Sequence, residues 1–95
     1  MSIKYYIYIL TDKTNSRLYT GMTTNLRRRI TELKQKSIKD YASRYNLNKL
    51  VFYDAFDNPV SALESKWQIR HSSIKKKSAL IEKMNKKWKD LSEEI

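Results

Sequence analysis

The stretch YYIYILTDKTNSRLYTG, residues 5–21, decides the fold of this chain. Residues 4–10 are bulky, rich in aromatic and β-branched side chains, and free of Gly and Pro, which is typical of a strand buried on both faces. Bulky side chains resume at residues 18–20, after a segment of turn formers. These turn formers are Asp12, Thr14, Asn15 and Ser16. The stretch therefore predicts a β-hairpin.

Alternation along the first strand places its side chains on two opposite faces. One face carries Tyr5, Ile7 and Ile9, and the other carries Tyr6, Tyr8 and Leu10. In the hairpin, Tyr8 and Tyr19 would lie on paired strands. We expect Gly21 just past the second strand, at a position that needs either a positive φ or the close approach of another group.

Length and composition limit the class of protein. The 95 residues predict a single domain, residues 1–95, with one modest core. The sequence has no cysteine and one histidine, which excludes disulfides, thiol catalysis and metal sites built on several Cys or His ligands. Because no apolar run has the length of a membrane span and no signal-peptide pattern is present, we expect a soluble, cytoplasmic protein without a membrane partner.

The charge of the chain favours a polyanionic partner. Twenty Lys and Arg residues against ten Asp and Glu residues give a formal net charge of +10. The excess is concentrated at Arg27, Arg28 and Arg29 and in residues 70–89. Nucleic acid is the first candidate for such a surface. The alternative interpretation is a solvated surface that only maintains solubility.

A helix is predicted from about residue 25 to about residue 36, because polar N-cap candidates precede an apolar pattern of helical period. The buried stripe of this helix consists of Leu26, Ile30 and Leu33. On a helical wheel Arg29 falls on the same side as this stripe. An inward arginine requires an anionic partner, either a protein carboxylate or a bound phosphate, unless its guanidinium reaches water at the edge of the core. Arg27 and Arg28 point away.

The rest of the chain completes an α+β fold. Residues 37–49 form a polar connection with one helical turn, and residues 50–56 predict a third strand. A second helix starts where Asn58 and Pro59 take the N-cap and N1 positions. A last short helix is predicted over residues 78–84, capped by Ser78. The predicted architecture is a three-stranded, mainly antiparallel sheet flanked by helices.

The helix that starts at Pro59 has an unusual residue on its predicted buried side. The stripe is expected to contain Leu63, Trp67, Arg70 and Ile74, widened by Val60, Ala62 and Ile69. Lys66 falls near the middle of this stripe, which is unexpected for a lysine. Glu64 projects to the side.

The order of these segments resembles the small single-domain members of the GIY-YIG nuclease superfamily. The segments are YIYIL, LYTG, LRRRI, LVFYDAF, ALESKWQI and ALIEKMNKKWKDL, and they cover essentially the whole chain. The resemblance places the signature tyrosines at Tyr8 and Tyr19 and the signature glycine at Gly21, with Thr20 in place of the usual aliphatic residue. The helix arginine of the family falls on Arg29, and its late asparagine falls on Asn85.

The resemblance implies an endonuclease that hydrolyses phosphodiester bonds in DNA with one divalent ion, Mg²⁺ or Mn²⁺. In that chemistry Tyr8, assisted by Tyr19, orients or deprotonates the water, and Arg29 clamps the phosphate. A tyrosine has an ordinary pKa of about 10, so a positive neighbour, such as Arg29 or the metal ion, must lower it before the tyrosine acts as a base. The residues expected at the substrate are Gly21, Arg27, Arg28, Asn85 and Lys66. By themselves, the tyrosines would be interpreted as core aromatics.

Two positions depart from the family pattern. The histidine of many members falls at Leu33, and the metal-binding glutamate falls at Lys66. A protonated lysine cannot coordinate a metal, although its ammonium could occupy the place of the cation beside the phosphate. Glu64 is the nearest substitute metal ligand, but two residues along a helix correspond to a rotation of about 200°, so only a bulge or a rotated helix would bring it to the site.

Three functional hypotheses remain open at the level of the sequence. The first is a metal-dependent endonuclease, impaired by Lys66. The second is a non-catalytic domain that binds nucleic acid on the same fold, and the third is a small basic module that binds proteins. For the first two, DNA is expected rather than RNA, and cutting of both strands of a duplex would require a homodimer or two sequential events.

Overall fold

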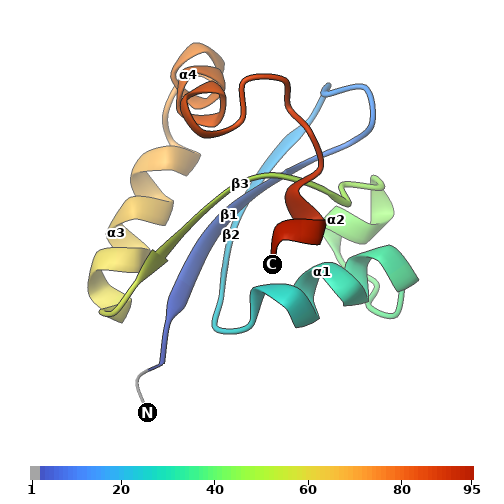
Figure 1. The fold of residues 1–95 in the computed structure, drawn as a ribbon, viewed down its shortest axis with the longest axis horizontal. Helices are drawn as coiled ribbons and strands as arrows, with labels where there is room; N and C mark the ends of the chain where they lie inside the picture. Colours follow the sequence, from blue (N-terminus) through green and yellow to red (C-terminus); the bar gives the residue numbers. More distant parts are fainter. Residues whose placement is uncertain (1–2) are drawn as a thin grey trace.

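The computed structural model describes residues 3–95. A central sheet separates two helical layers, with α3 and α4 on one face and α1, α2 and the short 3-10 helix η1 on the other (Figure 1). Within residues 3–95 no helix is both long enough and apolar enough to cross a bilayer. The elements in chain order are β1 (Tyr5–Thr11), β2 (Leu18–Thr23), α1 (Leu26–Gln35), α2 (Tyr41–Arg44), β3 (Lys49–Phe56), α3 (Pro59–Arg70), α4 (Ile74–Met84) and η1 (Leu91–Glu94).

The sheet confirms the predicted three-stranded antiparallel arrangement. Its strand order is β2-β1-β3, so the first strand lies in the centre and pairs with both neighbours. Ile7, Ile9 and Leu10 in β1 are fully buried. The prediction of a strand buried on both faces is therefore confirmed, and β2 forms one edge of the sheet.

The two faces of β1 belong to two separate apolar clusters. Tyr8 and Leu10 pack with the buried stripe of α1 and with Leu91 of η1. Ile9 packs on the opposite face with Ile81 of α4 and other residues from β3, α3 and α4. The alternation of β1 thus determines which helices cover which face.

The hairpin turn is organised by one carboxylate. Asp12 Oδ1 accepts hydrogen bonds from the backbone N–H groups of Thr14, at 3.1 Å, and Ser16, at 2.9 Å. The Ser16 hydroxyl also donates to Asp12 Oδ2, and this bond, followed by the one from the Ser16 backbone, lowers the pKa of Asp12 to about 2. The predicted turn is therefore an Asx-type turn in which Asp12 replaces missing backbone hydrogen bonds.

Gly21 lies inside β2 rather than after it, which corrects the expected position. It pairs with Tyr8 across the β1–β2 ladder, and its φ is not positive. The glycine is required by close approach, because a Cβ at this position would lie 2.5 Å from Cζ and 2.9 Å from Cε1 of Tyr8. The ring of Tyr8 occupies the space above the Gly21 backbone that any other side chain would fill.

The first helix agrees with its prediction. Asn25 caps α1 by accepting a hydrogen bond from Arg28 N at 3.0 Å, and Lys36 ends it in the left-handed conformation with φ 54°. The predicted stripe of Leu26, Ile30 and Leu33 is buried. The single helical turn expected in the following connection is α2.

The second predicted helix starts as expected but turns a different face to the sheet. Asn58 caps α3, with Pro59 in its first turn. Leu63 and Trp67 of the expected buried stripe are 49% and 64% exposed, so that prediction was wrong. The side facing the sheet carries buried Ala62 and the half-buried Lys66 and Ile69. Apolar residues occur all around this helix, so the sequence pattern could not select the face that packs.

The last helix is longer than expected. It runs from Ile74 to Met84, and Ser73 rather than Ser78 caps it, accepting a hydrogen bond from Lys76 N at 3.1 Å. Residues 74–77, which lie outside the predicted helix, thus form the first turn of α4. Lysine is a good helix former, so three consecutive lysines do not prevent this start.

We expect Gly21→Ala to destabilise the fold by about 1–3 kcal/mol, because the added methyl group overlaps the buried Tyr8 ring. Urea denaturation of Gly21→Ala and the parent measures this cost. In a Tyr8→Leu background the same substitution should cost much less, since the obstructing ring is gone. An equal cost in both backgrounds would show that the Tyr8 contact is not the reason for the glycine.

Candidate functional site

The predicted site residues Tyr8 and Arg29 meet on the α1 face of the sheet. Arg29 Nε donates a hydrogen bond to the Tyr8 hydroxyl at 3.0 Å. Arg29 Nη2 lies 2.8 Å from a carboxylate oxygen of Asp40, and the exposed fraction of the Arg29 side chain is 13%. The inward arginine therefore has the anionic partner that its position required, and this partner is a protein carboxylate.

Asp40 holds this arrangement at the start of α2. Its Oδ1 caps the helix by accepting a hydrogen bond from Ser43 N at 2.9 Å, while its other oxygen faces Arg29. Burial opposes ionisation of Asp40, but the hydrogen bond from Ser43 and the pairing with Arg29 outweigh it and lower its pKa. Asp40 thus fixes the direction of the guanidinium and stays negative at neutral pH.

The surroundings of Tyr8 do not favour the ionised form of its hydroxyl, which is the form that would act as a base. Tyr8 is 2% exposed, and this burial raises its pKa more than the hydrogen bond and charge of Arg29 lower it. Arg29 alone therefore does not meet the condition stated above for Tyr8 to act as a base, a pKa below its ordinary value. In this arrangement Tyr8 stays protonated at neutral pH and can donate a hydrogen bond or orient a neighbour.

Tyr19 joins the site through its ring. The rings of Tyr8 and Tyr19 are 6.4 Å apart between centroids, and Tyr19 in turn stacks on Tyr41 of α2 at 6.0 Å. The sequence analysis did not single out Tyr41 or Asp40. The one local signal for Asp40 was its place as a possible N-cap before a short helical turn, and nothing local connected either residue to Tyr8.

Arg28 lies beside Arg29 on the surface. Both line a polar hollow of about 210 Å³ together with Thr23 and Glu32. Arg28 Nε lies 3.5 Å from Glu32 Oε2 one turn later, and its side chain is 75% exposed. The guanidinium of Arg29 also carries Nη1, which makes no hydrogen bond to the part of the chain that the structure describes. The hollow is thus a place where an anion could reach both arginines.

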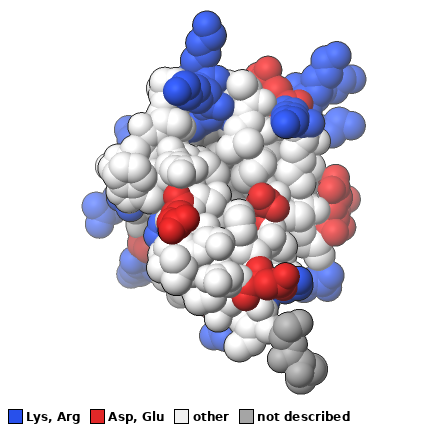
Figure 2. All heavy atoms as spheres, turned by 90° about the vertical axis from the view of Figure 1, so that its left-hand side faces the viewer, with Lys and Arg blue, Asp and Glu red and all other residues white. Residues whose placement is uncertain are grey.

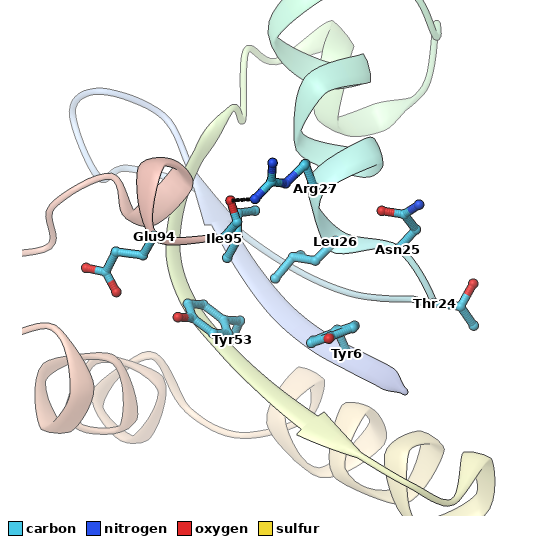
Figure 3. A pocket seen from close by; sticks show the side chains of 8 residues that line it. All are labelled: Tyr6, Thr24, Asn25, Leu26, Arg27, Tyr53, Glu94 and Ile95. Carbon is cyan, nitrogen blue, oxygen red and sulfur yellow. Dashed lines mark hydrogen bonds between the residues drawn. The ribbon is translucent and has the colours of Figure 1, made fainter. Parts of the chain in front are cut away.

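Arg27 is turned away from this group. Its Nη2 donates to the backbone oxygen of Ile95 at 2.6 Å, above a separate hollow of about 380 Å³ (Figure 3). This hollow is larger than the one at Arg29, but none of Tyr8, Tyr19 and Arg29 lines it. We therefore do not place the chemistry there. Its lining residues are Tyr6, Thr24, Asn25, Leu26, Arg27, Tyr53, Glu94 and Ile95.

Asn85 is occupied within the protein. It caps the end of α4 and is 6% exposed. Its amide nitrogen donates to the carbonyl oxygens of Val51, at 3.2 Å, and Lys89, at 2.7 Å, while its amide oxygen accepts from Lys89 N at 2.9 Å. These bonds tie the C-terminal segment to β3. A substrate contact would have to break them.

The residues on α3 do not fit a divalent cation. Lys66, at the position of the family's metal ligand, is half-buried on the side of α3 that faces the sheet, and Glu64 is exposed. The helix is regular through both positions, so no bulge brings Glu64 inward. Within residues 3–95 no cluster of three or more carboxylate or histidine ligands occurs. We therefore derive no chemical step through a metal ion.

The charges are unevenly distributed over the surface. Figure 2 shows the side of the molecule that carries α3 and α4, where the centre is mostly uncharged with several acidic side chains. Basic side chains gather at the top of this view, the end of the molecule where α4 lies. The outer face of α3, with Val60, Leu63 and Trp67 exposed, is therefore a poor surface for nucleic acid.

We expect Tyr8 to titrate above the ordinary tyrosine pKa of about 10, and to titrate higher still in Arg29→Met, because that change removes the group that lowers it. The stability that neutral Tyr8 contributes should be complete below about pH 10 and lost as the pH rises through its folded-state pKa. Ultraviolet titration of tyrosinate, with Tyr8→Phe subtracted, measures this. A Tyr8 step at or below that of free tyrosine would contradict the account.

Several known proteins are similar to this chain along most of its length. The UPF0213 protein from Natronomonas pharaonis is 32% identical, with 85% of this chain and 94% of that protein covered. One from Clostridium perfringens is 32% identical, with 95% and 96% covered. The solution NMR structure of a UPF0213 protein from Bacillus halodurans superimposes with a TM-score of 0.59 at 28% identity, and 93% of each chain is covered.

A family model identifies the family directly. The model of the GIY-YIG catalytic domain matches residues 4–79, which include β1, β2, α1 and α3. The match thus contains the paired strands of Tyr8 and Tyr19, the helix of Arg29 and the helix of Lys66. With this match, and with the shared fold of the Bacillus halodurans protein, the chain belongs to the GIY-YIG catalytic domain family.

Proposed function

We propose that this chain binds nucleic acid, with one backbone phosphate held by Arg29 beside Tyr8, and that metal-dependent cutting is impaired because Lys66 takes the place of the metal ligand. The proposal rests on the contacts of the Arg29 guanidinium. Its guanidinium is fixed on one side by Tyr8 and Asp40, while Nη1 has no partner within residues 3–95. An arginine held in this way can receive a phosphate oxygen with little loss of side-chain entropy.

The charge of the chain and its family support the same partner. A net charge of +10 on 95 residues attracts a polyanion, and Arg28 lies next to Arg29 in the same hollow. DNA is the form that we expect first, because the family resemblance implies DNA hydrolysis. RNA presents the same phosphates, so it belongs in the test.

Hydrolysis is the second candidate, and the assembly of Tyr8, Tyr19 and Arg29 favours it. Arg29 would neutralise charge on the attacked phosphate, and Tyr8, protonated by virtue of its burial, would orient the attacking water. In a cutting relative, Mg²⁺ or Mn²⁺ would stabilise the leaving oxygen. Lys66, which the family resemblance aligns with the metal ligand, cannot coordinate a cation while it is protonated.

Binding is tested with labelled DNA and RNA by fluorescence anisotropy over a series of salt concentrations. Arg29→Gln should weaken binding about tenfold or more, because a charge-assisted hydrogen bond to phosphate is lost. The slope of log affinity against log salt concentration should be smaller in magnitude for Arg29→Gln than for the parent by about 0.7–0.9, because one phosphate contact is lost. Arg28→Gln is the matched control, one residue away and 75% exposed, and should cost clearly less. Equal losses would indicate general charge attraction rather than an Arg29 site.

Cutting is tested in Mn²⁺ with EDTA, Tyr8→Phe and Lys66→Glu reactions alongside the parent. We expect no metal-dependent cutting by the parent and measurable cutting by Lys66→Glu, which restores a carboxylate on the side of α3 that faces the sheet. Cutting by the parent that EDTA and Tyr8→Phe both abolish would make the second candidate correct. If Lys66→Glu still binds DNA but does not cut it, then the lysine at position 66 is not the only feature that prevents cutting.

A further inference from the structure

Four tyrosine rings form a continuous row of neighbours, one pair stacked and two pairs tilted, that leads from the site to the surface. We call Tyr8, Tyr19, Tyr41 and Tyr45 the tyrosine ladder. Its successive ring centroids are separated by 6.4 Å, 6.0 Å and 4.8 Å. Three parts of the chain supply the rings, namely β1, β2 and the turn of α2 with its C-cap residue. Tyr41 and Tyr45 are neighbours through their helical i, i+4 spacing, whereas the contacts of Tyr8 with Tyr19 and of Tyr19 with Tyr41 join different elements.

The outer rings of the tyrosine ladder do not complete the core. Tyr41 is 49% exposed and Tyr45 is 37% exposed, whereas α2 buries Ala42. Tyr19 packs against the apolar cluster of the α1 face, but Tyr41 and Tyr45 are not part of that cluster. Large aromatic rings that remain exposed next to a candidate site are typical of binding surfaces.

Basic side chains lie next to the rings of the tyrosine ladder. Arg17 Cζ lies 4.2 Å from the centroid of the Tyr45 ring, and Arg17 Nη1 lies 3.5 Å from the Tyr41 hydroxyl. A hollow of about 330 Å³ is lined by Tyr19 and Tyr41 together with Arg70 of α3 and Lys77 of α4. The ladder therefore lies between basic side chains on both sides. This combination of stacked aromatic rings and positive side chains is the one that binds single-stranded nucleic acid.

We propose that Tyr41 and Tyr45 are a stacking platform for unpaired bases, and that the strand whose phosphate reaches Arg29 is single-stranded where it crosses the ladder. The inference rests on the proposed function and narrows its substrate class. In a duplex both faces of each base are covered by neighbouring bases, so only an unpaired segment can place its bases against the exposed parts of the Tyr41 and Tyr45 rings. A base on the Tyr45 ring would take the place of the Arg17 guanidinium that lies over it. The phosphates of that segment would pass near Arg17, Arg70 and Lys77.

A duplex ligand would give a different result. A duplex would use only its phosphates, and its affinity would depend on the cations and not on the rings. If the rings instead serve to bind another protein, the affinity of this chain for an oligonucleotide would not depend on whether the oligonucleotide carries bases. Both alternatives are therefore outcomes of the same experiment.

The experiment compares three labelled probes by fluorescence anisotropy: a short oligothymidine, an abasic oligonucleotide of the same length, and a duplex with the same number of phosphates. We expect the parent to bind the oligothymidine at least fivefold more tightly than the other two. Tyr41→Ala and Tyr45→Ala should each lose about fivefold or more for the oligothymidine alone, with the salt dependence unchanged. Tyr41→Phe and Tyr45→Phe keep the ring and should bind within twofold of the parent.

Trp67→Ala is the control for loss of an exposed aromatic ring elsewhere, because Trp67 is 64% exposed on the outer face of α3. It should leave the affinity unchanged. In the unaltered protein, the NMR signals of the Tyr41 and Tyr45 ring protons should shift on addition of the oligothymidine and not on addition of the abasic probe. This second measurement does not depend on how the alanine variants fold.

Equal affinity for the three probes, or unmoved Tyr41 and Tyr45 ring signals, would overturn the stacking platform. If Arg29→Gln still weakens binding in that case, the proposed function stands and only its substrate class is wrong. If no probe binds, or if binding is insensitive to Arg29, the proposed function itself fails.

Discussion

The contact between the Tyr8 ring and the Gly21 backbone is the constraint on which the site depends. It requires a residue without a side chain at Gly21 and the β1–β2 register that pairs these two positions. With the ring held there, its hydroxyl lies within hydrogen-bond distance of Arg29 Nε on α1. One close approach in the sheet therefore determines where the arginine of a neighbouring helix can point, which is how the fold positions the site.

The same burial that fixes Tyr8 sets its chemistry. The hydroxyl of a tyrosine that is 2% exposed is costly to ionise, and the hydrogen bond from Arg29 offsets only part of that cost. Asp40 in turn balances the charge of Arg29 and stays ionised. The result is a neutral donor beside a fixed cation, a pair suited to holding a phosphate and an attacking water. With Lys66 where a metal ligand is expected, the role that we propose for the pair is to bind phosphate without metal assistance.

Much of this could be predicted from sequence where one pattern dominates. The first strand has no competing pattern, and the one-sided stripe of α1 identified Arg29 as inward. The packed face of α3 could not be predicted, because Leu63 and Trp67 form as good an apolar stripe as Ala62 and Ile69, and only packing on the sheet selects between them. Asp40 was missed because its pairing with Arg29 is tertiary. Lys66 was unexpected on the helical stripe, but only the family resemblance aligned it with a metal-binding glutamate.

We infer that Arg29 receives a phosphate when nucleic acid binds. The most direct test follows the NMR signal of the Arg29 Nε–Hε group, assigned by comparison with Arg29→Gln, during titration with a short oligonucleotide. The account predicts that this signal shifts with saturation, together with the signals of Gly21 and Asp40, while Arg27 at its separate contact with Ile95 changes little. Shifts confined to the lysines of α4, with the Arg29 signal unmoved, would mean that nucleic acid meets only a general positive surface and would contradict the account.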